Sequence, residues 1–186
     1  MRQSSFIVFL IMIFSGSAYS SLSVDDVFNM IAKNSEKTLN YTEIHSETIF
    51  TKEIKVTGKV SFSNSGAMSK YVITPKKSEM HIVGDTLSLI NSDGVKSISL
   101  ANYPVLASSV NAIRWILSGE KDKVLEHYSV RYSLMGDSWI IELIPINKIV
   151  LLKVLSISIE GSHGDVDVIT LTKVNGVNVS TTFSRQ

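Results

Sequence analysis

The sequence predicts a mainly β fold, an antiparallel meander curled into a barrel or a deep half-barrel, with two helices added. Short segments of alternating polar and apolar residues fill most of the 186-residue chain, and turn signals separate them. Ser, Thr, Val and Ile are abundant while only three prolines are present, a balance that favours strands. The alternation gives way to helical spacing near the N-terminus and again in the middle of the chain.

The first twenty residues, 1–20, predict a cleaved secretory signal peptide. Arg2 supplies a positive charge, residues 6–14 form an unbroken apolar run, and Ala18-Tyr19-Ser20 places small residues where a signal peptidase cuts. The run is well short of the ~20 residues of a membrane-spanning helix. Because the chain contains no cysteine, there is none to lipidate. We therefore expect one mature domain, 21–186, exported as a soluble protein.

Composition excludes several function classes. The chain has 18 basic and 17 acidic residues, so its net charge favours neither nucleic acid nor an acidic membrane surface. The absence of cysteine excludes a disulfide scaffold, a thiol nucleophile and cysteine-based metal sites. About 165 residues after cleavage suit a single domain with a sizeable core.

Helical spacing of apolar residues predicts two helices and a short helical turn, at 23–39, 104–118 and 121–127. The first begins with a capping box, in which the hydroxyl of Ser23 precedes the carboxylate of Asp26 by three residues. The second begins at Pro104, whose ring suits the first turn of a helix. Gly119 then serves as its C-cap.

About ten short strands account for the rest of the chain. A first strand runs through Ile44, Ser46, Thr48 and Phe50. The pair Asn175-Gly176 is the strongest hairpin signal and separates the last two strands. The other strands are expected at 54–62, 68–74, 79–83, 86–91, 95–100, 128–135, 138–145, 152–160, 165–174 and 177–184.

Catalytic and metal-binding patterns are weak in this sequence. The histidines stand in four different segments without ligand spacing between them: His45, His81, His127 and His163. Ser138 follows a Gly-Asp turn between two alternating strands, which is not the strand–helix elbow of a hydrolase serine. Asp25 and Asp26 are explained by capping of a helix. We expect no catalytic residue, no metal site and no cofactor.

One apolar strand face is the strongest functional feature. Its residues form one concave side of the sheet: Ile54, Val56, Val60, Phe62, Ile73, Met80, Ile82, Leu87, Leu89, Trp139, Ile141 and Leu143. Patterning alone favours a filled core over a cavity for a greasy ligand. Methionines at 68, 80 and 135 move the balance slightly toward a cavity, because flexible thioethers suit adaptable apolar sites.

The order of elements and an ordered set of short motifs resemble the LolA-like family of periplasmic outer-membrane lipoprotein carriers, in its divergent LolA-related branch. The set covers nearly the whole mature chain, and each motif alone is weak. It consists of Gly58-Lys59-Val60-Ser61-Phe62, residues 68–75, residues 80–89, Tyr103-Pro104-Val105-Leu106, residues 113–120, Trp139 to Pro145, Ile157 to Gly161, Asn175-Gly176 and a last strand ending in Phe183.

The resemblance implies an open, incomplete antiparallel β-barrel whose helices form a lid over a hydrophobic cavity. It implies a soluble, monomeric periplasmic carrier that takes acylated lipoproteins from an inner-membrane exporter to an outer-membrane receptor. The apolar residues given above, with Trp115 on the second helix, then become cargo-binding residues. The helices 23–39 and 104–118 become the lid.

One position departs from the family. The better-known carriers have an Arg-Pro pair just after the strand corresponding to 58–63, and that arginine latches the lid to backbone carbonyls. Here Asn64-Ser65 stands at that place, and Lys70 is the nearest cation. The resemblance therefore supplies no latch at this position. Two alternatives remain: a carrier of another acylated amphiphile, such as a glycolipid or pigment, and an envelope-assembly module with a filled core.

Overall fold

The computed structural model describes residues 22–34, 37–46, 53–63 and 65–185. The signal peptide expected at 1–20 lies outside the described residues. The helices are α1 Val24–Asn34, the 3-10 turn η1 Leu100–Asn102, α2 Pro104–Leu117, α3 Lys121–His127 and α4 Lys148–Leu151. None of the described helices is long and apolar enough to cross a membrane.

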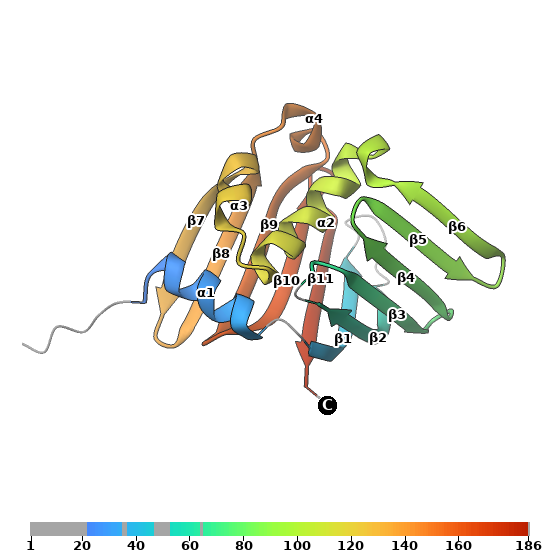
Figure 1. Ribbon diagram of the computed structural model, residues 1–186, viewed down its shortest axis with the longest axis horizontal. Coiled ribbons are helices and arrows are strands. Elements are labelled where there is room, and N and C mark those ends of the chain that lie inside the picture. The colour runs from blue at the N-terminus through green and yellow to red at the C-terminus, as the bar shows by residue number, and fades with distance from the viewer. Residues whose placement is uncertain (1–21, 35–36, 47–52, 64, 186) are drawn as a thin grey trace, which may run out of the picture.

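The strands form a single antiparallel sheet (Figure 1). They are β1 Lys37–Ser46, β2 Ile54–Phe62, β3 Met68–Thr74, β4 Ser78–Val83, β5 Thr86–Asn91, β6 Gly94–Ser99, β7 Tyr128–Met135, β8 Ser138–Pro145, β9 Val154–Ser162, β10 Asp165–Lys173 and β11 Asn178–Ser184. Their order is β6-β5-β4-β3-β2-β1-β11-β10-β9-β8-β7, so β6 and β7 are the two edges. The mainly β, open antiparallel architecture is confirmed, and the sheet does not close into a barrel.

The N- and C-terminal strands meet in the middle of the sheet. Strand β1 pairs with β2 on one side and with β11 on the other, as in the pairs Tyr41–Gly58 and Tyr41–Phe183. Helix α2 runs obliquely over the centre of one face, and α1 crosses the same face over the β7–β10 half (Figure 1). The helices therefore cover one side of the sheet, which is the arrangement expected of a lid.

Two apolar clusters lie between the sheet and these helices. The larger joins α1, α2 and α3 to strands β7–β10 and contains the fully buried Trp139, Ile141 and Leu143. The smaller joins Val110 of α2 to strands β1–β5 and contains Val60 and Ile82. Helix α2 contributes to both clusters, so it links the two halves of the sheet.

The first helix is shorter than its apolar spacing predicts. The capping box is confirmed, since Ser23 Oγ accepts a 3.2 Å hydrogen bond from Asp26 N and Ser23 N donates to the Asp26 carboxylate at 3.0 Å. The hydrogen bonds that the carboxylate accepts from the Ser23 hydroxyl, at 2.6 Å, and from the Ser23 amide lower the pKa of Asp26. The helix ends at Asn34 instead of residue 39, because Lys37 already begins β1. Pairing of residues 37–39 with residues 60–62 of β2 satisfies backbone groups that a longer helix would have kept.

The first strand and one connection also differ from expectation. Ile44 and Ser46 are the end of β1 instead of its start, and Thr48 and Phe50 lie outside the described residues. The short helix α4 precedes β9, which begins at Val154 instead of residue 152. The side chain of Asn147 caps this helix, accepting hydrogen bonds from the amides of Ile149 and Val150.

Candidate functional site

A small apolar cavity lies on the concave side of the sheet beneath α2. Its volume is about 160 Å³, close to that of an engineered apolar cavity that binds benzene. Ser109, Val110 and Ile113 line it from the helix. Strands β1–β4, β10 and β11 supply the rest: Tyr41, Glu43, Val60, Phe62, Met68, Lys70, Met80, Ile169, Thr181 and Phe183. A cavity of this volume has room for a ring or a short stretch of alkyl chain.

The apolar residues expected at the site divide into three groups. Val60, Phe62 and Met80 line the cavity. Ile82, Leu87, Trp139, Ile141 and Leu143 are buried within the two clusters, and Val56 and Trp115 are half-buried against them. Ile54, Ile73 and Leu89 are 49, 50 and 37% exposed. The structure therefore brings only part of the expected set together around one space.

A second space adjoins the cavity at Ser109. This open groove, of about 850 Å³, lies between the start of α2, the α4–β9 connection and the β10–β11 hairpin. Its volume falls within the ~300–1,000 Å³ typical of small-molecule sites. On the other side of the cavity, Phe62, Ile169 and Phe183 also line a third space of about 90 Å³. The three spaces follow one another along the underside of α2, each sharing lining residues with the next, and we call this series the apolar track.

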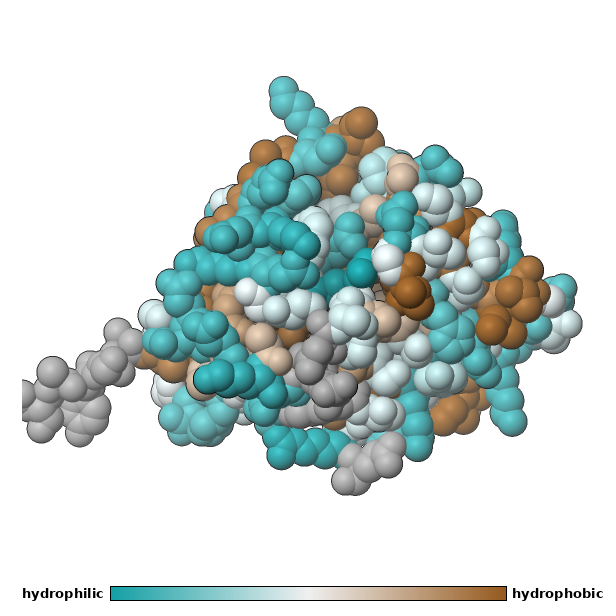
Figure 2. Space-filling model, in the orientation of Figure 1, coloured by the Kyte–Doolittle hydropathy of each residue, from teal (hydrophilic) through white to brown (hydrophobic). Residues whose placement is uncertain are grey.

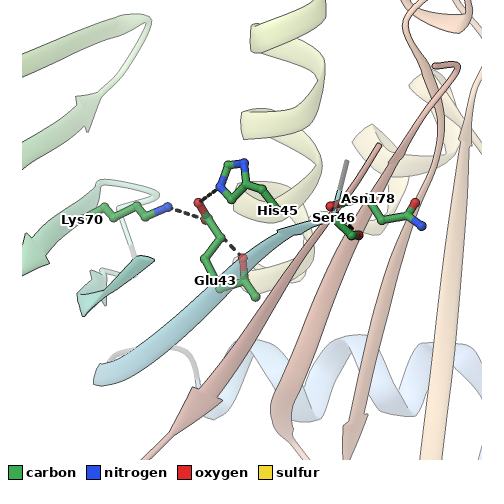
Figure 3. Close-up of polar contacts among 6 residues, drawn as sticks. Glu43, His45, Ser46, Lys70 and Asn178 are labelled. Atoms are coloured by element: carbon green, nitrogen blue, oxygen red, sulfur yellow. Dashed lines mark hydrogen bonds and ion pairs between the residues drawn. The ribbon is translucent and has the colours of Figure 1, made fainter. Parts of the chain in front are cut away.

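A polar cluster lies in the wall of the cavity (Figure 3). Lys70 Nζ of β3 lies 2.5 Å from Glu43 Oε2 of β1, and His45 Nε2 lies 2.7 Å from Glu43 Oε1. Thr181 of β11 also donates to Glu43 Oε2, at 3.3 Å. Burial raises the pKa of Glu43, but the charge and hydrogen bond of Lys70, with His45, outweigh it, so the pKa lies below its ordinary value. Glu43 is therefore a partly buried anion held by three donors.

Tyr41 lies beneath this cluster. Its ring centroid is 4.7 Å from Lys70 Nζ, a cation–π contact, and burial with the nearby Glu43 charge raises the pKa of Tyr41 to about 12. The residue is 3% exposed. Among buried side-chain polar atoms in the described part of the chain, its hydroxyl is the one without a hydrogen-bond partner. Such a group has free capacity for a polar atom of a ligand.

Helix α2 is fastened to the sheet by an arginine. Arg114 Nε donates to the carbonyl of Gly66 in the β2–β3 turn at 2.6 Å, and Nη1 donates to the carbonyl of Gly84 in the β4–β5 turn at 2.7 Å. Both acceptors are turn carbonyls, which a guanidinium reaches with its fixed fork of donors. This contact is the chain's own latch between helix and sheet. In this contact the donor side chain is on α2, and the acceptor carbonyls are in turns of the sheet.

The positions that the sequence suggested for a latch are Asn64, Ser65 and Lys70, and the latter two contact residues of the sheet and its turns. Asn64 lies outside the described residues, and Ser65 Oγ lies 2.7 Å from Ser63 Oγ within its own turn. Lys70 pairs with Glu43 and lies on the sheet. Sequence reasoning missed Arg114, although one signal was available: it is the only charged residue in the 104–117 segment. The Glu43–Lys70 pair carried no such signal, because its members are 27 positions apart and stand in ordinary alternating strands.

The other polar residues that the sequence raised as candidates are three histidines and Ser138, and the histidines contact neighbouring residues of the fold. His81 lies between Ser69 and Glu79, and the ring of His127 packs against Trp115 at 4.7 Å. The carbonyl of His163 accepts a hydrogen bond from the Trp139 indole. Ser138 is exposed at the start of β8. Within the described ranges no three His, Asp or Glu side chains gather into a group able to hold a metal ion.

Comparison with known proteins identifies the family. Residues 16–184 match the family described as "Outer membrane lipoprotein carrier protein LolA-like". A search of curated sequences finds no match.

Similar solved structures have low sequence identity. A LolA superfamily protein from Nitrosomonas europaea has 9% identity and a TM-score of 0.45, covering 88% of this chain and 92% of that one. MucB from Pseudomonas aeruginosa, in its complex with MucA, has 10% identity and a TM-score of 0.48, covering 87% of this chain and 55% of that one. LprF from Mycobacterium bovis has 11% identity and a TM-score of 0.35, covering 86% of this chain and 90% of that one.

Proposed function

Because this chain belongs to the LolA-like family of outer membrane lipoprotein carrier proteins, we propose that it binds the acyl chains of lipoproteins and carries them from the inner to the outer membrane. Proteins of this family are carriers or binding proteins, and we propose no catalytic role. The observation that supports the proposal is the apolar track under α2, which combines a cavity of about 160 Å³ with an adjoining groove of about 850 Å³.

The size of the cavity requires the lid to move during loading. Each buried methylene contributes ~0.8 kcal/mol, so one fully buried 16-carbon chain contributes on the order of 12 kcal/mol. A shuttle that bound several chains so tightly would not release them. A cavity of about 160 Å³ takes only a short part of one chain while α2 is closed. Displacing α2, with loss of the Arg114 hydrogen bonds, opposes binding and keeps the affinity within a range that permits transfer.

The polar wall of the cavity suits the junction between an acyl chain and its headgroup. Tyr41 has an unpartnered hydroxyl, and the ammonium of Lys70 carries more N–H groups than its single bond to Glu43 uses. An ester or amide carbonyl accepts hydrogen bonds from both kinds of donor. The chain ends would then extend along Val60, Phe62 and Met80.

The same polar wall supports the runner-up function, a carrier of another acylated amphiphile such as a glycolipid or an acylated pigment. Both cargo classes present acyl carbonyls, so the cavity alone accommodates either. The exported location, the cleaved peptide 1–20, the mature domain 21–186, a monomeric state and transfer between an inner-membrane exporter and an outer-membrane receptor are parts of the carrier proposal. The envelope-assembly alternative with a filled core predicts no specific ligand.

Native mass spectrometry of the delipidated protein separates these functions. The probes are a triacylated lipopeptide, the same peptide without acyl chains, and a glycolipid with matched chains. The carrier proposal expects a one-to-one complex with the lipopeptide and none with the bare peptide. Preference for the glycolipid supports the runner-up. Failure of both acylated probes to bind, with the protein folded by circular dichroism, contradicts any carrier function.

A further inference from the structure

Three loops meet at one end of the sheet, around α4. They are residues 102–109 at the start of α2, residues 146–155 around α4, and residues 171–176 at the β10–β11 hairpin, which together line or flank the groove of about 850 Å³. A backbone hydrogen bond of 3.1 Å from Val174 N to the Lys153 carbonyl joins the last two. We call this surface the α4 tip. In Figure 1 it lies at the upper edge of the molecule.

The α4 tip exposes many large apolar side chains. Ile146, Ile149, Leu152 and Val174 are 55, 60, 71 and 50% exposed. Counting all three loops, the tip holds seven of the fifteen exposed large hydrophobic residues in the described part of the chain. Figure 2 shows hydrophobic side chains gathered at this edge. A concentration of this kind marks an interaction surface, whereas scattered apolar residues need no explanation.

The charge of the tip is uniformly positive. Lys148, Lys153 and Lys173 lie in its loops, and residues 102–109, 146–155 and 171–176 contain no Asp or Glu. No ion pair joins these lysines to another described residue. The whole chain is nearly neutral, with a formal charge of +1, so the positive field is local. Apolar side chains surrounded by lysines are the composition of surfaces that enter the interface of an anionic bilayer.

We propose that the α4 tip docks on the surface of an anionic lipid bilayer. Ile146, Ile149 and Leu152 enter the headgroup–acyl boundary, and the three lysines contact the negative headgroups. The groove that begins between these loops then faces the membrane. An acyl chain leaving the bilayer reaches the cavity under α2 through the groove, past Ser109, without crossing water. This docking goes beyond the proposed carrier function, because binding of an isolated lipopeptide does not require it.

Vesicle co-sedimentation tests the proposal. The delipidated protein is mixed with vesicles of phosphatidylcholine alone, or of phosphatidylcholine and phosphatidylglycerol in equal parts. We expect binding to the anionic vesicles that weakens as salt is raised, and little binding to the neutral ones. Equal binding to both compositions, or binding to neither, overturns the proposal; the second result would assign the tip to a protein partner.

Two sets of variants locate the contact. The double change Ile146→Asn with Ile149→Asn should weaken binding to anionic vesicles at least tenfold, roughly what loss of partial burial of two side chains implies. Its control, Val95→Asn with Met135→Asn, changes side chains that are 71 and 73% exposed away from the tip and should have no effect. If both double variants lost vesicle affinity equally, the assignment of the α4 tip as the docking surface would be overturned.

The lysines are tested by neutralisation. Changing the three lysines of the tip to glutamine should weaken anionic-vesicle binding on the order of a hundredfold. The control changes Lys33, Lys59 and Lys77, all exposed elsewhere, to glutamine and loses the same total charge. If the control weakens binding as much, only net charge matters and the tip is not the docking surface.

Lipopeptide binding distinguishes this proposal from the carrier function. Ile146 and Ile149 do not line the groove, so their double variant should bind the soluble triacylated lipopeptide as the wild type does. Normal lipopeptide binding with undiminished vesicle binding would overturn docking at the tip while leaving the carrier function intact. Vesicle binding without any lipopeptide binding would support docking and contradict the carrier function.

Discussion

Arg114 of α2 and Gly84 of the β4–β5 turn are joined by a 2.7 Å hydrogen bond from guanidinium Nη1 to the carbonyl oxygen. The same side chain reaches Gly66 in the β2–β3 turn through Nε, at 2.6 Å. One arginine thus bridges two hairpins and fastens α2 to the β2–β5 half of the sheet. The donor is on the helix and the acceptors are on the sheet, so opening α2 and breaking the contact are one event.

Replacing Arg114 by methionine should loosen this helix. Hydrogen bonds to charged groups each contribute about 1.5–3 kcal/mol where they are protected, and the partial exposure of Arg114 reduces the effect, so we expect a loss of about 1–3 kcal/mol in the free energy of unfolding. Amides of α2 should exchange hydrogen faster, and binding of a hydrophobic dye should rise. Urea unfolding, hydrogen exchange and dye fluorescence measure the three effects.

A matched control is Arg131→Met on β7. Arg131 is 71% exposed and pairs with Glu142 at 3.2 Å, so its loss should change the free energy of unfolding by less than about 1 kcal/mol. The conservative variant Arg114→Lys should restore little, because an ammonium lacks the fork that reaches two carbonyls. Unchanged exchange of α2 amides in Arg114→Met would show that the contact does not hold the helix.

The partly buried Glu43 carboxylate should make stability depend on acid pH. Its pKa in the folded protein lies below the ordinary value of 4.5: burial opposes this shift, and Lys70 with His45 causes it. A lowered folded pKa stabilises the protein above pH 4.5. That contribution disappears as the pH falls through the folded pKa. Urea titrations across this range should show a steeper decline for the wild type than for Glu43→Gln.

The control for this prediction is Glu126→Gln, which removes an exposed carboxyl from α3. Its unfolding free energy should follow the wild-type curve at each pH. The double variant Glu43→Leu with Lys70→Met should be more stable than either single variant, because each single change leaves one member of the pair buried without its partner. An acid profile of Glu43→Gln identical to the wild type would show that the carboxylate is not stabilised by the cluster.

Local patterns were sufficient to predict most of the sheet. Strands 68–74, 86–91, 128–135 and 138–145 begin and end as expected, because alternation and Gly-containing turns are properties of neighbouring residues. The end of α1 was not predictable in this way. Residues 37–39 suit a helix by spacing, and what places them in β1 is pairing with residues of β2 more than 20 positions away, such as Thr38 with Ser61.

The site was less predictable than the fold, for the same reason. Alternation identifies which residues share a strand face, and three of the residues it grouped, Val60, Phe62 and Met80, line one cavity in the structure. It does not show where a helix crosses that face, so Ile141 and Leu143, buried beneath the helices, could not be distinguished from Leu89, left 37% exposed. The contact of Arg114 with Gly66 joins positions 48 apart and follows only from the packing of α2.

A bulky side chain at Ser109 should close the apolar track. Ser109 lines both the cavity and the open groove, and its hydroxyl donates a hydrogen bond to the carbonyl of Val105, at 3.3 Å. We expect Ser109→Trp to reduce lipopeptide affinity at least tenfold, or ~1.4 kcal/mol. Isothermal titration calorimetry measures the loss. The control, Ser133→Trp on exposed β7 surface, should bind as the wild type does, and equal affinity in both variants would contradict a path past Ser109.

Substitutions at two apolar positions should distinguish a core residue from a residue that lines the cavity. Ile141 is fully buried in the larger cluster, so Ile141→Ala should cost about 2–5 kcal/mol of unfolding free energy. Met80 is half-buried and lines the cavity, so Met80→Ala should cost less than about 2 kcal/mol, since fewer contacts are lost. Lipopeptide affinity should show the reverse order, falling in Met80→Ala and remaining near wild type in the folded fraction of Ile141→Ala. Denaturant unfolding measures the free energy of unfolding, and calorimetry on the same samples measures the lipopeptide affinity. If both variants lost unfolding free energy and lipopeptide affinity to the same extent, the cavity would be ordinary core and cargo would bind elsewhere.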